Sequence, residues 1–227
     1  MKDVSIVIPC VDMLELTRGC VELIEKHTPP VYELIIVADE CQAEMLDWLE
    51  TLEAKVITNP KRVGPIPAIN MGFKEAEGKY VAVLNNDTSV TEGWLEPLIA
   101  ALEDHHDFGW VTSQYMRANV LAKFGPSCSL YLKEALDKVG LIDERFNEGE
   151  GWEDNDLLLR FWQAGYQPHG ISKSFVYHPP ESATFTALWG TSQGAQRLQR
   201  SEHNLRLLVE KWGLLVIGID WINLPYL

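Results

Sequence analysis

Short apolar runs alternate with amphipathic stretches along the first hundred or so residues of the chain. The apolar runs are rich in Val, Ile, Leu and Tyr, which is typical of buried strands, and they cover residues 4–9, 32–38, 55–58 and 80–84. Between them, apolar side chains recur at helical spacing in residues 13–27, 43–52 and 65–77. Strands separated by helices of this length indicate βαβ units, and therefore an α/β fold with a mostly parallel central sheet flanked by helices.

The segments that follow these four strands are expected to meet. In a parallel sheet, ligands bind at the carboxyl ends of the strands. The four segments, which should line one edge of the sheet, are residues 10–12, 39–41, 59–62 and 85–87.

The pattern is less regular in the second half. After a predicted helix at 94–104, apolar runs predict strands, in a smaller antiparallel part, at 109–113, 127–132 and 174–177. Helical spacing predicts helices at 134–139, 153–164 and 193–212. Because no linker separates the halves, we predict a single domain over residues 1–227, made of a first half (1–104) and a second half (105–227).

The overall charge argues against one class of partner. The formal net charge is −14, from 19 Lys and Arg against 33 Asp and Glu, and no local basic patch is evident. Such a surface repels nucleic acid phosphates, so a nucleic acid partner is not expected. The hydrophobic content of 46% is that of an ordinary soluble globular protein.

Cysteine spacing and the ends of the chain predict the cellular location. Four cysteines are present without a CxxC pair, which favours reduced thiols over a zinc site or a disulfide framework. We expect no signal peptide and no membrane-spanning segment, and therefore a cytoplasmic protein. The run of Trp and aliphatic residues at 212–222 is predicted to pack on the domain or on a second copy of the chain, with peripheral membrane contact as the alternative.

Two acidic sites carry the candidate chemistry. Asn85-Asn86-Asp87 directly follows the strand at 80–84. Residues i and i+2 of an extended chain point the same way, so Asn85 and Asp87 can converge on one metal-bound diphosphate. Mg²⁺ and Mn²⁺ both accept carboxylate oxygens. The same sequence is also a good turn, which is the alternative interpretation.

The second acidic site opens a helix. Glu153 and Asp154 begin the helix predicted at 153–164, where the helix dipole favours ionised carboxylates, although a capping role is the alternative. His178 follows a strand, and a neutral imidazole suits a metal position, although a lone histidine is more often structural. Arg62 follows the third strand, where it can contact phosphates, with an ordinary solvated position beside Lys61 as the alternative. Trp152 can stack on a sugar ring of an acceptor, but it suits a protein core equally well.

Taken together, these segments resemble the family 2 glycosyltransferases of the GT-A fold over nearly the whole chain. The similarity is carried by segments in the family's order, namely 4–9, 59–72, 78–88, 93–95, 151–157 and 211–213. In the metal-binding triplet, which is of the DxD type in this family, only the last carboxylate is present here, as Asp87. The resemblance implies a Rossmann-like nucleotide-sugar-binding half at 1–104 and an acceptor-binding, catalytic half at 105–227.

The resemblance also implies a donor and a metal site. The donor would be a nucleoside-diphosphate sugar, in the first instance UDP-linked, and the cofactor a divalent metal, Mn²⁺ or Mg²⁺. Asp87 and His178 would bind the metal. The residues implied in donor binding are Pro9, Asp12, Asp39, Arg62, Asn70, Asn85 and Asn86.

The implied reaction is an inverting displacement at the anomeric carbon. Asp154 would deprotonate the acceptor hydroxyl, and Glu153 would support it. The acceptor could be a glycan, a lipid-linked glycan, a protein or a small molecule.

Three other functions are alternatives for a chain of this kind. A sugar nucleotidyltransferase needs a glycine-rich loop after the first strand, and residues 10–14 contain no glycine. A dehydrogenase is disfavoured because GxGxxG is absent. A non-catalytic nucleotide-sugar-binding module remains the main alternative.

Overall fold

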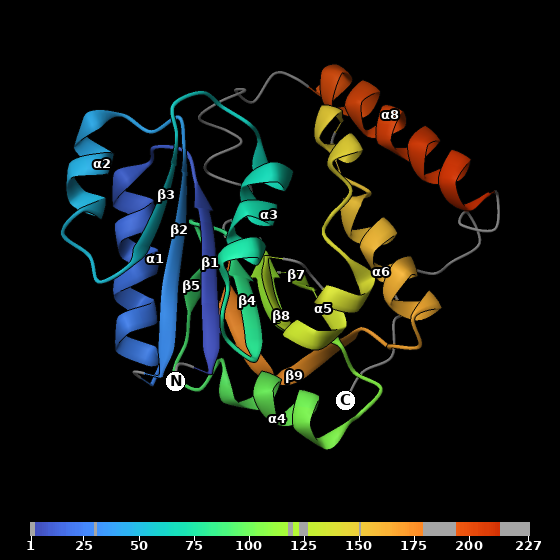
Figure 1. Cartoon of the computed structure of the whole chain (residues 1–227), viewed down its shortest axis with the longest axis horizontal. Helices are drawn as coiled ribbons and strands as arrows, with labels where there is room; N and C mark the ends of the chain where they lie inside the picture. The colour runs from blue at the N-terminus through green and yellow to red at the C-terminus, as the bar shows by residue number, and fades with distance from the viewer. Residues whose placement is uncertain are drawn as a thin grey trace.

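A single mixed sheet runs through the molecule, with helices on both faces (Figure 1). The computed structural model describes residues 3–29, 31–117, 120–122, 127–149, 151–178 and 194–213. Within these residues the strand order is β3-β2-β1-β4-β8-β6-β9-β5, with β7 paired to β6. The α/β fold with a central sheet flanked by helices is therefore confirmed.

The first four strands are parallel and lie where the apolar runs predicted them. They are β1 (Val4–Cys10), β2 (Tyr32–Asp39), β3 (Lys55–Asn59) and β4 (Tyr80–Leu84). β1 lies between β2 and β4, and β2 pairs with β3. β1 and β4 are buried along almost their whole length, which explains why they read as continuous apolar runs rather than as alternating patterns.

The second half completes the same sheet. β8 (Cys128–Leu132) pairs antiparallel with β4, and β6 (Trp110–Arg117) pairs antiparallel with β8. β9 (His169–Tyr177) is parallel to β6, so the predicted antiparallel part is only partly antiparallel. β9 also begins five residues before the predicted strand, because a bulge interrupts its pairing with β6 and hides the periodicity.

Two very short strands were not predicted. β5 (Ser89–Val90) pairs antiparallel with β9, and β7 (Val120–Ala122) pairs with β6. Runs of two or three residues carry no usable periodicity, so only their pairing partners define them.

The helices form one layer on each face of the sheet. α1 (Leu14–His27), α2 (Ala43–Leu49) and α4 (Glu96–Asp104) pack on one face, with alternate strand residues such as Ile6, Ile8 and Ile36. α3 (Pro65–Glu75), α5 (Lys133–Val139), α6 (Glu153–Gln163) and α8 (Gly194–Trp212) pack on the other, with Val7 and Ile35. Alternate residues of each strand point to opposite faces of the sheet, so the strands contribute side chains to both cores.

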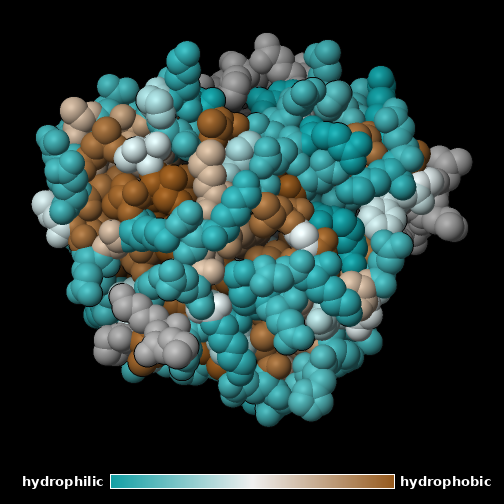
Figure 2. Space-filling view, viewed as in Figure 1, coloured by the Kyte–Doolittle hydropathy of each residue, from teal (hydrophilic) through white to brown (hydrophobic). Residues whose placement is uncertain are grey.

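The molecular surface differs over these layers. In the view of Figure 2 the region over α6 and α8 is mostly hydrophilic, whereas hydrophobic residues gather over the β2–β3 side of the sheet. Within the described part of the chain, no helix combines the length and apolar character needed to cross a bilayer. Most of the apolar run at 212–222 lies outside the described residues, so its predicted packing stays a prediction.

Candidate active site

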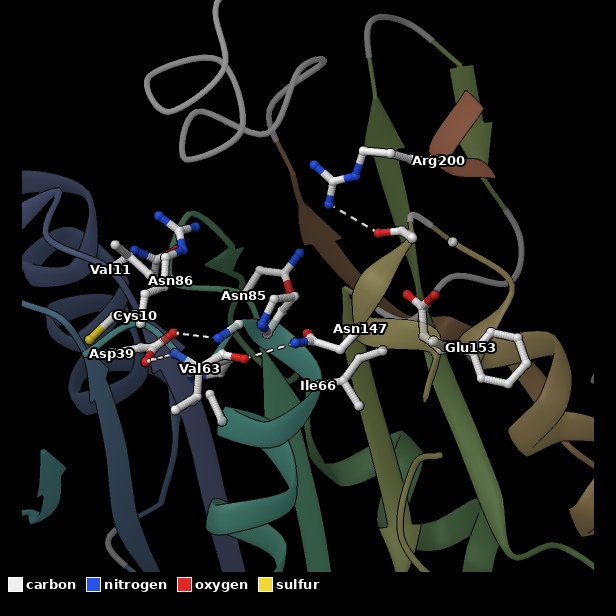
Figure 3. A pocket seen from close by; sticks show the side chains of 18 of the residues that line it. Cys10, Val11, Asp39, Val63, Ile66, Asn85, Asn86, Asn147, Glu153 and Arg200 are labelled. Atoms are coloured by element: carbon white, nitrogen blue, oxygen red, sulfur yellow. Dashed lines mark hydrogen bonds between the residues drawn. The ribbon is translucent and has the colours of Figure 1, made fainter. Parts of the chain in front are cut away.

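A cavity of about 530 Å³ opens at the carboxyl ends of β1, β2 and β4. Each of the four segments expected at this edge supplies at least one lining residue, among them Cys10, Asp39, Arg62 and Asn85. The opposite wall comes from the second half of the chain, through the segment before α6 and through α8 (Figure 3). The predicted convergence of the four strand ends is therefore confirmed.

Asp87 and His178 meet beside this cavity. His178 Nε2 lies 3.3 Å from Asp87 Oδ1, and both side chains are almost fully buried. Asn85 Nδ2 lies 3.1 Å from the same imidazole nitrogen. The pairing of β5 with β9 explains this contact, because opposing Ser89 to Tyr177 in antiparallel register brings His178 next to residue 88.

This pair suits two adjacent ligands of one divalent ion. Two ligand atoms that lie about 2.1 Å from an ion, at right angles to each other, are roughly 3 Å apart. This is close to the 3.3 Å between His178 Nε2 and Asp87 Oδ1. No group of three or more His, Cys, Asp or Glu side chains able to hold a metal occurs among the described residues. The pair would therefore suit an ion that takes further ligands from a bound diphosphate, as Mg²⁺ commonly does.

Asn86 lines the cavity, and its amide also holds the segment after β4 in place. Its Nδ2 donates to Thr17 Oγ1 at 3.0 Å, and both residues are buried. This bond ties the end of β4 to α1. Asn85 and Asn86 thus point to different neighbours, as expected for successive residues of an extended segment.

Asp39 stabilises the loop before α3. Its carboxylate is 2% exposed and accepts hydrogen bonds from Val63 N (2.8 Å) and Gly64 N (2.9 Å). Gly64 has φ +94°, a backbone conformation that favours glycine. Asp39 therefore lines the cavity while using both oxygens to shape its wall. Sequence reasoning assigned it only to the donor.

Asn147 reaches the same loop from the opposite side. Its Nδ2 donates to Val63 O at 2.8 Å, and a Cβ on Gly64 would lie 2.5 Å from Asn147 Oδ1 (Figure 3). Asn147 thus joins the second half of the chain to the loop that lines the cavity. Sequence reasoning missed Asn147, which lies six residues before Glu153 and outside the segment 151–157.

The remaining predicted donor residues differ in position. Pro9 and Arg62 line the cavity. Asp12 does not line it, and instead accepts a hydrogen bond from Gln42 N at the start of α2. Asn70 is buried and also lies away from the lining, because its amide exchanges hydrogen bonds with the backbone of Ile142. The positions of Asp12 and Asn70 give no support for a direct donor contact.

Glu153 and Asp154 point in different directions from the start of α6. Glu153 lines the cavity, whereas Asp154 is not among the lining residues. Burial, followed by the charge of Glu153, raises the pKa of Asp154 well above the usual carboxyl range. Burial, with the charge of Asp154 as a second cause, also raises the pKa of Tyr131 on β8. Asp154 is half-buried and lies outside the lining of the cavity.

Trp152 lies toward α8 in this structure. Its Nε1 donates to Ser201 Oγ at 3.0 Å, its ring packs against the apolar cluster beneath α6, and it is not among the lining residues. This position fits the core alternative, and the acceptor contact of Trp152 stays a prediction.

Strained backbone gathers at this edge. Of the described non-glycine residues, those with positive φ are Asp12 (41°), Met13 (59°), Glu40 (60°) and Trp152 (71°). The first three lie in loops after β1 and β2, and the last directly precedes Glu153. Such conformations cost free energy and cluster at functional sites.

Two free thiols border the same edge. Cys41 Sγ donates to Cys10 O at 3.7 Å and accepts from Asp12 N at 3.3 Å. The hydrogen bond between the two thiols lowers the pKa of Cys41 and, together with burial, raises that of Cys10. Cys10 lines the cavity directly.

Comparison with known proteins agrees with this geometry. Residues 5–128, more than half of the chain, match the model of the family described as "Glycosyl transferase family 2". The chain belongs to glycosyl transferase family 2. An uncharacterized glycosyltransferase, YwdF, of Bacillus subtilis (strain 168) is 26% identical over 93% of this chain and 84% of its own length. Glycosyltransferase GlyG of Streptococcus pneumoniae serotype 4 is 27% identical over 70% of this chain and 64% of its own.

Solved structures of glycosyltransferases share the GT-A-type fold. The mannosyltransferase PcManGT from Pyrobaculum calidifontis, in complex with GDP-Man and Mn²⁺, has a TM-score of 0.71 at 14% identity, over 92% of this chain and 64% of that one. TarS 1–349 of S. aureus, in complex with UDP-GlcNAc, has a TM-score of 0.67 at 18% identity, over 78% and 58%. The chain thus spans less than two thirds of either solved chain.

Proposed function

We propose that this family 2 chain transfers a sugar from a nucleoside-diphosphate sugar, UDP-linked in the first instance, to an acceptor hydroxyl with inversion at the anomeric carbon. The observation that carries the proposal is the convergence of Asp87, His178 and Asn85 at the cavity formed by the strand ends. It is supported by structural neighbours whose complexes contain GDP-Man with Mn²⁺, and UDP-GlcNAc.

Asp87 and His178 are the proposed metal-binding residues. A divalent ion there, Mn²⁺ or Mg²⁺, would offset negative charge on the leaving nucleoside diphosphate. Asn85 Nδ2 donates to the same imidazole nitrogen, and once a metal takes the lone pair of that nitrogen, the amide can donate to phosphate instead. Arg62, on the adjacent loop, adds a cation for the same phosphates.

The nucleoside is proposed to lie along the first half of the cavity. Pro9 and Asn86 line this side, and Asp39 fixes the loop of Val63 and Gly64 that bounds it. An ordered loop excludes water and presents backbone groups at fixed positions to the base or ribose.

Asp154 is the proposed general base, with Glu153 beside it at the cavity wall. A base must be partly deprotonated and yet basic at neutral pH, and burial together with Glu153 raises the pKa of Asp154 in that direction. Catalytic hydrogen bonds often align only when substrate is bound, so a half-buried Asp154 outside the cavity lining is compatible with this role. Glu153 and Asn85 lie on different walls of the cavity (Figure 3), as a single displacement from the side opposite the leaving group needs.

Thermal denaturation with nucleotides tests the proposal. UDP, GDP and their sugars are each added with and without Mn²⁺. A ligand at about one hundred times its Kd should raise the Tm of a chain of this size by roughly 5–10 °C. One nucleotide should give a metal-dependent rise that Asp87→Asn abolishes and that Asp47→Asn, an exposed change on α2, retains.

Two results would contradict the proposal. If no nucleotide raises the Tm of the folded protein, the cavity is not a donor site. If nucleotide sugars bind but are not hydrolysed even slowly in the presence of metal, the chain is a non-catalytic binding module.

A further inference from the structure

Arg200 lines the cavity from α8, and the proposed function does not yet use it. Its Nη2 donates to Gly149 O at 3.0 Å, and its guanidinium lies on the same side of the cavity as Glu153 (Figure 3). Arg200 comes from the second half of the chain, some fifty residues from the loop that it contacts.

Neighbouring residues of α8 hold Arg200 at this wall. Asn204, one helical turn further on, is fully buried, and its Nδ2 donates to Phe146 O (2.8 Å) and Gly151 O (2.7 Å). Gly149 packs so closely that a Cβ there would lie 2.0 Å from Asn204 Oδ1. The guanidinium is therefore carried by a backbone that is fixed relative to the segment leading to Glu153.

The cations of the cavity are divided between its two walls. Among the described lining residues they are Arg62, on the donor side, and Arg200, on the side of Glu153. The donor diphosphate is already met by Arg62 and by the metal expected at Asp87 and His178. Arg200 instead stands where the acceptor must enter to present its hydroxyl to the base.

A guanidinium at this position favours a ligand with a negatively charged group. It offers a planar fork of donors that matches the oxygens of phosphate or carboxylate, and charge-assisted bonds of this kind are about twice as strong as neutral ones. The chain has a net charge of −14, so its overall field repels anions. A cation facing the cavity can therefore attract an anion only at short range.

We propose that the acceptor carries an anionic oxygen group, a phosphate or a carboxylate, which Arg200 binds while the acceptor hydroxyl faces Glu153 and Asp154. This inference rests on the proposed function, because it takes the other wall of the cavity as the donor site.

Anion binding to the donor-saturated protein tests whether Arg200 binds an anionic acceptor group. The ¹⁵N-labelled protein is saturated with its nucleoside diphosphate and Mg²⁺, and inorganic phosphate or acetate is then titrated while the arginine Nε–H signals are followed. At least one of these anions should bind saturably and shift the Arg200 signal. Arg200→Gln should raise the Kd of the anion at least about tenfold, and Arg200→Lys should raise it less. Arg206→Gln, an exposed change on the same helix, should leave the Kd unchanged.

The outcomes separate this inference from the proposed function. If the nucleotide binds normally but neither anion binds saturably, the acceptor site for an anion is excluded and the transferase proposal stands. If Arg200→Gln weakens nucleotide binding as much as anion binding, Arg200 belongs to the donor site or only supports the loop. Arg200→Lys replaces Arg200→Gln in this test if the latter does not fold. If no nucleotide binds at all, the proposed function fails and this inference fails with it.

Discussion

Two adjacent carboxylates at the start of α6 have different surroundings, and this difference predicts different consequences of mutating them. If Asp154 is the base, Asp154→Asn preserves its shape but removes the proton acceptor, and kcat should fall by roughly 10²–10⁴. Glu153→Gln should lower kcat less. Steady-state turnover of the nucleotide sugar identified by thermal shift checks both variants. A larger loss in Glu153→Gln would make Glu153, which lines the cavity, the base instead.

The stability of Asp154→Asn supplies an internal check on that assignment. Burial, and then the charge of Glu153, raise the pKa of Asp154, so between about pH 4 and that raised pKa the folded state holds a proton that the unfolded state releases. The stabilisation from this group is complete below about pH 4 and is lost as the pH rises through the folded pKa. The Tm of Asp154→Asn should therefore exceed that of wild type at pH 8, by a margin that shrinks towards pH 4. A margin independent of pH would mean that Asp154 is not held in this environment.

At the scale of elements, α8 keeps the segment before α6 in its cavity-forming position. Asn204 donates to the carbonyls of Phe146 and Gly151, and Lys211, near the end of the helix, contacts Asp143 and Asp156 at 2.9 and 2.7 Å. Asn204 provides the cleanest test of this role, because its side chain is fully buried and its amide makes two defined hydrogen bonds.

Asn204→Asp keeps the volume of the side chain but replaces a donor by a carboxylate facing two carbonyl oxygens. We expect the free energy of unfolding to fall by about 2–4 kcal/mol, the cost of two lost bonds and the unpaired groups left behind. Urea denaturation measures this. Glu202→Gln, at an exposed position of the same helix, should change the free energy of unfolding by less than about 0.5 kcal/mol. Equal stability of Asn204→Asp and wild type would show that α8 does not hold this segment.

At the scale of the whole molecule, the two halves share one sheet. β4 pairs with β1 on one side and with β8 on the other. Val81 and Val83 of β4 belong to the same buried cluster as Trp110 and Phe161 from the second half. Without the second half, this edge and this face would be exposed to water.

We therefore expect residues 1–104 alone to remain unfolded and the full chain to unfold in one transition. Circular dichroism of the fragment and denaturation of the full chain followed by two probes check this. A folded, cooperatively melting fragment, or two separate transitions in the full chain, would contradict the single domain predicted from the sequence.

The sequence alone determined the strands and helices of the first half, and with them the position of the site. Parallel strands place their carboxyl ends at one edge, so local periodicity was enough to bring Cys10, Asp39, Arg62 and Asn85 together. His178 was a metal-site candidate from its place after a strand, and the resemblance to family 2 glycosyltransferases implied the same role. The short strands and the long β9 escaped prediction, because they are defined by pairing partners distant in the chain rather than by their own periodicity.

Only the tertiary structure decided which way individual side chains point. Successive residues of a helix differ by about 100° around its axis, so the packing of α6 on its neighbours, and not the spacing of Glu153 and Asp154, turns Glu153 into the cavity and leaves Asp154 outside its lining. Asn147 and Arg200 reach the cavity from sequence positions that carry no motif, because their roles depend on contacts with Val63 and Gly149 that only folding creates.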